Sequence, residues 1–165
     1  MPELPEVQAH AERLAEQFAG RVLRRFVPFN FTVAEDRRPS DPTRPTGWPL
    51  VDVGRRGKYL LVRFEPVTFV IHLMQGGRLL VDDKQSAKPR NGRGRFVFDD
   101  GPALLLTEAG TERHAGVWCV ANASGRTPLD APPLDRLGPD ALTLTAAELG
   151  ARVRRHQHAH PRVPP

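Results

Sequence analysis

The first residues of the chain bring together groups that could perform covalent and proton-transfer chemistry. Pro2 follows Met1, and a small second residue normally allows the initiator methionine to be removed. The exposed secondary amine of Pro2 would then be an α-amino group, for which the ordinary pKa is about 7.7–8.0. Its condensation with an aldehyde gives an iminium that is cationic without an added proton and therefore withdraws electrons strongly. Glu3 and Glu6 are nearby proton-transfer groups. Proline followed by glutamate is also ordinary helix-start chemistry, so both interpretations are open at this point.

A run of cations stands at the entrance to an apolar segment in the middle of the sequence. Arg55, Arg56 and Lys58 precede the mostly apolar residues 59–62. A strand does not need such a cluster in order to fold. The run is therefore either a solvated strand end or a phosphate-binding site, and its spacing alone allows both interpretations.

Two further segments place polar groups between apolar runs. Residues 70–73 lead into Met74, Gln75 and a Gly-Gly pair at 76–77, which is typical of a hairpin turn. Residues 84–95 contain no acid, and we expect them to form a flexible basic loop whose cations contact phosphates. These cations are Lys84, Lys88, Arg90, Arg93 and Arg95.

The element that must position the opening residues is a helix predicted over residues 3–19. Its apolar residues recur at the spacing of one helical face, and Gly20 is typical of a helix end. Pro2 and the two glutamates would therefore lie at a helix N-terminus, where the dipole and the free N–H groups favour anions such as phosphate. The apolar residues are Val7, Ala11, Leu14, Ala15 and Phe18.

Short apolar segments separated by turn signals predict strands through the rest of the chain. A Pro-rich, charged stretch at 36–49 predicts a loop among them. Strands at this spacing favour an antiparallel sandwich or barrel. Thr145 and Glu148 form a capping-box pattern for a last helix that would run to about Arg155. The predicted strands are 21–29, 50–54, 58–65, 67–73, 77–82, 94–99, 103–107 and 116–121.

The composition limits the classes of function. The 165 residues fit one domain with a small appendage, and the net charge of +5 favours an anionic partner such as nucleic acid. A merely basic protein without such a partner is the alternative that charge alone leaves open. Cys119 is the single cysteine, which excludes an internal disulfide and a four-cysteine zinc site. No apolar run approaches the length of a membrane span and no signal peptide is evident, so we expect a soluble cytoplasmic protein.

Four of these strings together resemble the formamidopyrimidine-DNA glycosylase/endonuclease VIII family of bacterial DNA-repair proteins. They are residues 1–7, 55–62, 70–79 and 107–118, and residues 137–142 resemble the family's link to its helical domain. The resemblance implies an α+β, mainly β fold, in which an antiparallel β-sandwich is flanked by an N-terminal helix and a short C-terminal helix. It also implies a catalytic domain over residues 1–135, followed by a linker and the start of the helical domain, with a basic tail, over 136–165.

In this family the N-terminal proline is the nucleophile, so the resemblance implies base excision with strand cleavage at an abasic site. Pro2 would attack C1′ of a flipped nucleotide, and Glu3 would protonate the sugar ring oxygen. Glu6 would tune the site, and Lys58 would hold phosphate and share proton transfer. No cofactor is implied, and the zinc site of the family is not expected here.

The resemblance also implies a set of DNA contacts. Either Met74 or Gln75 would be the wedge that fills the duplex when a base is extruded, because the family usually has methionine at the position of Gln75. Arg113 matches the first arginine of the family's Arg-Arg-Phe loop, whereas His114 and Ala115 replace the next two groups and leave the preferred damaged base open. The expected DNA-binding residues are Arg55, Arg56, His72, Met74, Gln75, Arg93, Arg113 and His114.

The expected partner is double-stranded DNA with a damaged base or an abasic site, bound by a monomer associated with the bacterial nucleoid and not with a membrane. The resemblance ends near residue 149, and the helical domain and zinc finger with which the family continues do not follow. A non-catalytic or weakly active DNA-binding remnant is therefore the alternative function. An unrelated sandwich that binds acidic partners would require the four strings to be coincidental.

Overall fold

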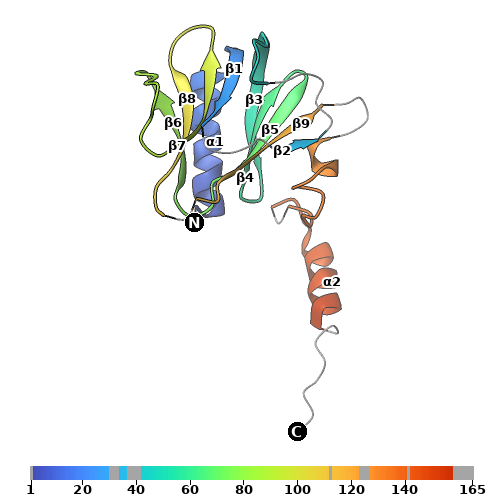
Figure 1. The fold of residues 1–165 in the computed structure, drawn as a ribbon. Helices are drawn as coiled ribbons and strands as arrows, with labels where there is room; N and C mark the ends of the chain where they lie inside the picture. Colours follow the sequence, from blue (N-terminus) through green and yellow to red (C-terminus); the bar gives the residue numbers. More distant parts are fainter. Residues whose placement is uncertain are drawn as a thin grey trace.

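The computed structural model describes residues 2–29, 34–36, 42–111, 113–122, 127–140 and 142–157. A nine-stranded sheet and two α-helices account for most of this part of the chain (Figure 1). The elements are α1 (Leu4–Phe18), β1 (Val22–Pro28), β2 (Ala34–Asp36), β3 (Trp48–Arg56), β4 (Tyr59–Phe64), β5 (Val67–His72), β6 (Gly77–Asp82), β7 (Gly92–Phe98), β8 (Ala103–Glu108), β9 (Gly116–Ala121), a 3-10 turn (Pro128–Asp130) and α2 (Ala146–Gln157).

Helix α1 forms where its apolar spacing predicts, because one face of it completes the core. Val7, Ala11, Leu14 and Phe18 are each 1% exposed, while the opposite face is solvated. Its N-terminus is closed by a capping box, in which the carboxylate of Glu6 accepts the N–H of Glu3 at 2.9 Å. The helix is thereby fixed at the end that bears Pro2.

The sheet runs in the order β2-β9-β5-β4-β3-β1-β7-β8-β6 and folds into two layers. The first layer contains β9, β5, β4 and β3, and the second contains β1, β7, β8 and β6. The layers are joined by the short β1–β3 pairing, in which Val22 faces Pro49 and Leu23 faces Trp48. All pairings are antiparallel except that of β2 with β9. The predicted antiparallel sandwich is confirmed.

The core lies between the two layers and against α1. Aromatic rings from both layers meet there: Phe26 and Phe96 have ring centroids 4.7 Å apart, and Phe69 and Phe96 have centroids 4.9 Å apart. Tilted and edge-on contacts of this kind add to the burial of the rings. Cys119 is buried in the same cluster.

A second, smaller core lies on the outer face of the first layer. Leu134, which is 2% exposed, packs there with Val70 and Val120. The Pro-rich connection before α2 is therefore laid against the sheet and is not a free linker. Helix α2 follows it and extends away from the β-sandwich (Figure 1). The predicted capping box is present, since Glu148 Oε2 accepts the N–H of Thr145 at 2.8 Å and Thr145 Oγ1 accepts the N–H of Glu148 at 3.3 Å.

Three local expectations are wrong. The loop predicted over 36–49 is present at 42–47, but its ends are wrong: Asp36 belongs to β2, and β3 begins at Trp48, which packs against the core; residues 37–41 lie outside the described part of the chain. The basic loop predicted over 84–95 ends at Gly92, where β7 begins. The segment 73–76 is not a hairpin turn, since β5 pairs with β4 and β9 whereas β6 pairs with β8. It crosses from one layer to the other.

Candidate active site at the start of helix α1

The N-terminus of α1 brings the opening residues together at one end of the sandwich. Pro2 is half-buried, whereas Glu3 is exposed and precedes the first turn of the helix. Glu6 is engaged in the capping box, so its carboxylate holds the backbone that follows Pro2. The structure thus shows the helix-start chemistry of this string, and the same capping box orients the backbone next to Pro2.

Lys58 reaches this site from the turn between β3 and β4. Gly57 adopts a φ of +57°, which favours glycine and reverses the chain tightly before β4. The ammonium Nζ of Lys58 donates to Oε1 of Glu3 at 3.1 Å, across 55 positions of sequence. The side chains are 38% and 67% exposed, so this pair can separate at little free-energy cost.

The neighbouring arginines are engaged inside the fold. Arg55, with its side chain 8% exposed, donates from Nε to Gln8 Oε1 at 2.7 Å and from a terminal nitrogen to Asp140 Oδ2 at 2.9 Å. Arg56 lies 3.6 Å from the same Asp140 oxygen and donates to the carbonyl of Gly138. The N–H of Leu142, followed by these guanidinium groups, lowers the pKa of Asp140.

A pocket of about 310 Å³ opens beside Pro2 and contains residues that sequence reasoning missed. Its walls include Glu6, His10 and Arg13 from α1 and Arg78 from β6. Burial, and then the charges of Arg13 and Arg78, lower the pKa of His10. The helical spacing of positions 6, 10 and 13 was the available signal, but nothing in the sequence indicated that Arg78 would face it.

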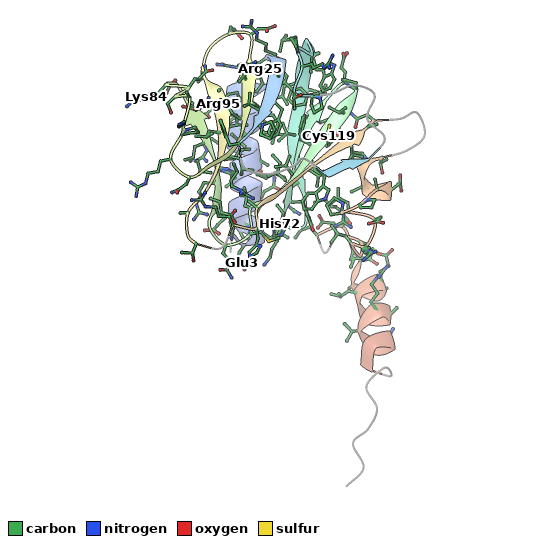
Figure 2. All side chains as sticks on the ribbon, viewed as in Figure 1. Glu3, Arg25, His72, Lys84, Arg95 and Cys119 are labelled. Atoms are coloured by element: carbon green, nitrogen blue, oxygen red, sulfur yellow. The ribbon has the colours of Figure 1, made fainter. Side chains whose placement is uncertain are left out.

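His72 lies at the end of β5 close to the same site, and Figure 2 shows it near Glu3. Its Nδ1 accepts the N–H of Met74 at 3.1 Å, and its ring meets the edge of Tyr59 at 4.7 Å between centroids. Burial, and then the positive charge of Lys58, lower the pKa of His72. The neutral ring that results can serve as the acceptor for Met74.

The turn that follows holds the two predicted wedge residues in different positions. Met74 has a φ of +51° and is half-buried, whereas Gln75 is exposed at the tip. A β-carbon on Gly77 would lie 2.2 Å from the carbonyl oxygen of Leu73, so only glycine allows this close crossing. The geometry therefore favours Gln75 as the side chain presented outward.

The segment between β8 and β9 supplies Arg113 and His114, both exposed, and Ala115, which is buried. Arg113 donates to Asn91 Oδ1 at 3.3 Å. Arg93 is only 8% exposed and its Nε lies 3.5 Å from Oε2 of Glu108, so the structure places it inside the fold; its contact with DNA stays a prediction.

Several other basic residues lie at the opposite end of the sandwich (Figure 2). Figure 2 shows Lys84, Arg95 and Arg25 far from Glu3 and His72. Arg95 is 6% exposed and donates to Asp82 at 2.8 Å. Among the described residues, no group of three histidine, cysteine, aspartate or glutamate side chains could hold a metal ion. No helix in that part of the chain is long and apolar enough to span a membrane.

Solved structures with the same fold are proteins bound to DNA. One is MutM in complex with DNA containing carbocyclic 8-oxo-G, with a TM-score of 0.60 and 17% identity over 73% of this chain and 45% of that one. Another is the Lactococcus lactis formamidopyrimidine-DNA glycosylase bound to DNA containing an AP site, with a TM-score of 0.58 and 16% identity over 73% and 45% of the two chains. The fold class is thus the β-sandwich that the chain shares with part of each of these proteins.

The family follows from sequence. The model of the formamidopyrimidine-DNA glycosylase N-terminal domain matches residues 1–114, and the chain belongs to this family. It is 34% identical to the formamidopyrimidine-DNA glycosylase of Thiobacillus denitrificans over 96% of this chain and 57% of that protein. It is 36% identical to that of Bordetella parapertussis over 84% and 49%. The chain spans about half of the length of these curated relatives.

Proposed function

We propose that the chain is a base-excision DNA glycosylase with abasic-site lyase activity and that Pro2 is its nucleophile. One observation carries the proposal: Pro2 directly precedes a capped helix and lines a pocket, and Lys58 reaches the adjacent Glu3 at 3.1 Å from the turn between β3 and β4. An amine, a carboxylate and an ammonium in one exposed site are the groups that imine chemistry on a sugar requires. The relatives named formamidopyrimidine-DNA glycosylase support the same assignment.

The proposed reaction forms and breaks bonds as follows. The lone pair of the Pro2 nitrogen attacks C1′ of an extruded nucleotide, and the bond from C1′ to the damaged base breaks. The base leaves with the electron pair of that bond and takes up a proton. The sugar ring then opens, with a proton delivered to its oxygen, to give an iminium between Pro2 and C1′. Because the iminium withdraws electrons, the C2′ hydrogen becomes acidic, and its loss expels the 3′ phosphate.

Glu3 and Lys58 are the proposed proton carriers. Their 3.1 Å contact allows a proton to pass between Nζ and the carboxylate, and the exposure of both groups leaves the sugar access to either. Hydrolysis of the final imine with water releases the product and restores the amine. The proposed chemistry therefore uses water and the protein's own iminium, and it requires no metal or organic cofactor.

Exposed groups at the same end support double-stranded DNA with an extruded nucleotide as the substrate. Gln75 is at the tip of the crossing turn, and Arg113 is exposed on the β8–β9 segment. A side chain inserted into the duplex offsets part of the few kcal/mol that extrusion of a base costs. We propose Gln75 as this wedge, and Arg113 and His72 as contacts to the strand, made by a monomer.

Borohydride trapping tests the proposed chemistry directly. The protein with Met1 removed would be incubated with a duplex containing an abasic site, and the reduced covalent adduct would be measured by mass. Pro2→Gly should lose most of the adduct, and the matched control Pro5→Ala, an exposed proline on the same helix, should retain it. No adduct under conditions in which a full-length relative is trapped would overturn the proposal.

A DNA-binding protein without turnover is the second candidate. It is favoured by the exposure of Gln75 and Arg113, because contacts of these side chains with DNA would not require the amine of Pro2. The same variants separate the two functions, because such a protein would show no adduct and Pro2→Gly would leave its affinity for the duplex unchanged.

A further inference from the structure

Glu108 is a buried carboxylate that the proposed reaction does not use. It is the last residue of β8 and is 2% exposed. Its Oε1 accepts the N–H groups of His114 and Ala115, each at 2.9 Å, and its Oε2 accepts the N–H of Ala115 at 3.0 Å. The Nε of Arg93 lies 3.5 Å from Oε2. A carboxylate with so little exposure requires such donors, because its transfer from water is otherwise very unfavourable.

All of the groups named around this carboxylate are donors. Two are backbone N–H groups of one segment and one is a guanidinium. An amide of the same shape would turn its NH₂ group toward one of these donors and lose at least one bond. Hydrogen bonds to an ionised acceptor are about twice as strong as neutral ones. The charge of Glu108 therefore determines where the backbone of residues 113–115 lies.

The main chain at Glu108 also connects two other loops. The N–H of Glu108 donates to the carbonyl of Asn91 at 2.9 Å, and the side chain of Asn91 accepts from Arg113. The next residue, Ala109, donates to the carbonyl of Gly76 at 3.4 Å in the crossing turn. A β-carbon on Gly76 would lie 2.5 Å from the Ala109 carbonyl oxygen, so the two segments are in tight contact.

We propose that Glu108 is a positioning residue that holds the segment bearing Arg113 in register with the turn bearing Gln75. The carboxylate holds residues 113–115 through the N–H groups of His114 and Ala115. Ala109 holds the neighbouring crossing turn through the carbonyl of Gly76. Both side chains are thereby presented together at the end of the molecule where Pro2 lies. The proposal rests on the proposed function only in that DNA meets this end.

Two measurements on Glu108→Gln test the proposal. The first is amide hydrogen exchange of His114 and Ala115, which should accelerate at least about tenfold, the effect of losing one hydrogen bond to a charged group. Amides of the core strands, such as those of Leu104 and Leu106, should be unchanged. The second is the preference for an abasic-site duplex over an undamaged one, which should fall about tenfold by the same loss.

Two further variants separate positioning from folding. Thr107→Ala removes a neighbouring exposed hydroxyl that lies 3.5 Å from the Arg78 carbonyl, and it should change neither measurement. Asn91→Gly retains the φ of +57° at this position and the carbonyl that binds Glu108, but removes the acceptor for Arg113. It should reduce the preference for the abasic duplex while the exchange of Ala115 stays as in the wild type. If Glu108→Gln does not fold, the preference of Asn91→Gly for the abasic duplex tests the positioning role.

Either of two results would overturn the positioning role: unchanged exchange at His114 and Ala115 in Glu108→Gln, or accelerated exchange with an unchanged preference for the abasic duplex. If Glu108→Gln does not fold, an unchanged preference for the abasic duplex in Asn91→Gly would overturn the positioning role. A wild-type chain with no preference at all would instead show that the proposed function has failed. The exchange measurement would still establish whether Glu108 fixes the segment.

Discussion

One run of cations lies in two different environments in the fold. Arg55 and Arg56 precede Gly57 and are mostly buried, whereas Lys58 follows Gly57 and is more exposed. The arginine side chains are 8% and 16% exposed and converge on Asp140, which lies 85 positions from Arg55. The lysine side chain is 38% exposed and meets Glu3, which is more exposed still. The run therefore forms a buried structural clamp on one side of the turn and an exposed ion pair on the other.

Burial, and not charge, distinguishes the two arginines from the lysine. A buried pair cannot lose one partner without leaving an uncompensated charge. An exposed pair exchanges its partner for water or substrate at little cost, because water screens both states. The following predictions test this contrast, from the largest expected effect to the smallest.

Lys58→Met should reduce the rate of adduct formation about 100-fold, the low end of what a proton-transfer group contributes. The free energy of unfolding should change by less than about 0.5 kcal/mol, because the pair with Glu3 is exposed. Trapping rates and thermal melting measure the two quantities. Lys84→Met, at the opposite end of the sandwich, is the control and should leave both unchanged. A Lys58 variant with a lowered melting temperature and an unchanged trapping rate would contradict this assignment, because Lys58 would then be the structural residue.

Arg55→Met should lower the free energy of unfolding by about 2 kcal/mol, because it removes hydrogen bonds to Gln8 and to the charged Asp140. For a chain of this size the melting temperature should fall by about 4–8 °C. Arg63→Met is the matched control on the neighbouring strand. Its 2.9 Å pair with Asp52 has both side chains about half exposed, at 52% and 47%, and should contribute less than about 1 kcal/mol. Equal losses in the two variants would contradict the role of burial.

Asp140→Asn should reveal the acid dependence of the clamp. The N–H of Leu142 and the two arginines lower the pKa of Asp140 in the folded protein. A lowered carboxyl pKa stabilises the fold above its unfolded value, about 3.9, and this stabilisation is lost as the pH falls through the folded pKa. Denaturant unfolding should thus show a stability gap between wild type and variant at pH 7 that closes toward pH 3. A gap independent of pH would show that the carboxylate charge contributes nothing.

The titration of His72, which lies near the exposed Lys58, should give the smallest effect on stability. Burial and Lys58 lower its pKa, so the folded state binds its proton less readily than the unfolded state. Its contribution to stability should be complete above about pH 6.5 and decline as the pH falls toward the folded pKa. In an NMR titration the ring should titrate below 6.5, and the amide shift of Met74 should follow the same midpoint because Nδ1 accepts that N–H. A midpoint above 6.5 would contradict this environment.

The sequence predicts the framework well because local patterns determine it. The apolar spacing of α1, the short apolar segments of the strands and the capping box of α2 are all found in the structure. The position of β7 is different: Arg93 and Arg95 look like solvated loop residues, but partners at Glu108 and Asp82 allow both to be buried in a strand.

The candidate site could be predicted only in part, because several of its contacts join residues that are far apart in the sequence. Pro2, Glu3 and Lys58 follow from the resemblance, and the structure brings the last two together. The clamp on Asp140 depends on a contact across most of the chain, which local patterns do not contain. Arg78 reaches the pocket of Pro2 because the segment 73–76 crosses between layers, whereas its Gly-Gly pair predicts a hairpin.

The most direct test of the central claim is to locate the trapped sugar on the chain. After borohydride reduction with an abasic-site duplex, the protein would be digested with trypsin and the modified peptide sequenced by mass spectrometry. The account predicts that the added mass lies on the nitrogen of Pro2, in the peptide that ends at Arg13, and that Lys58→Met retains this site at a lower yield. Modification of Lys58 with an unmodified Pro2 would contradict it.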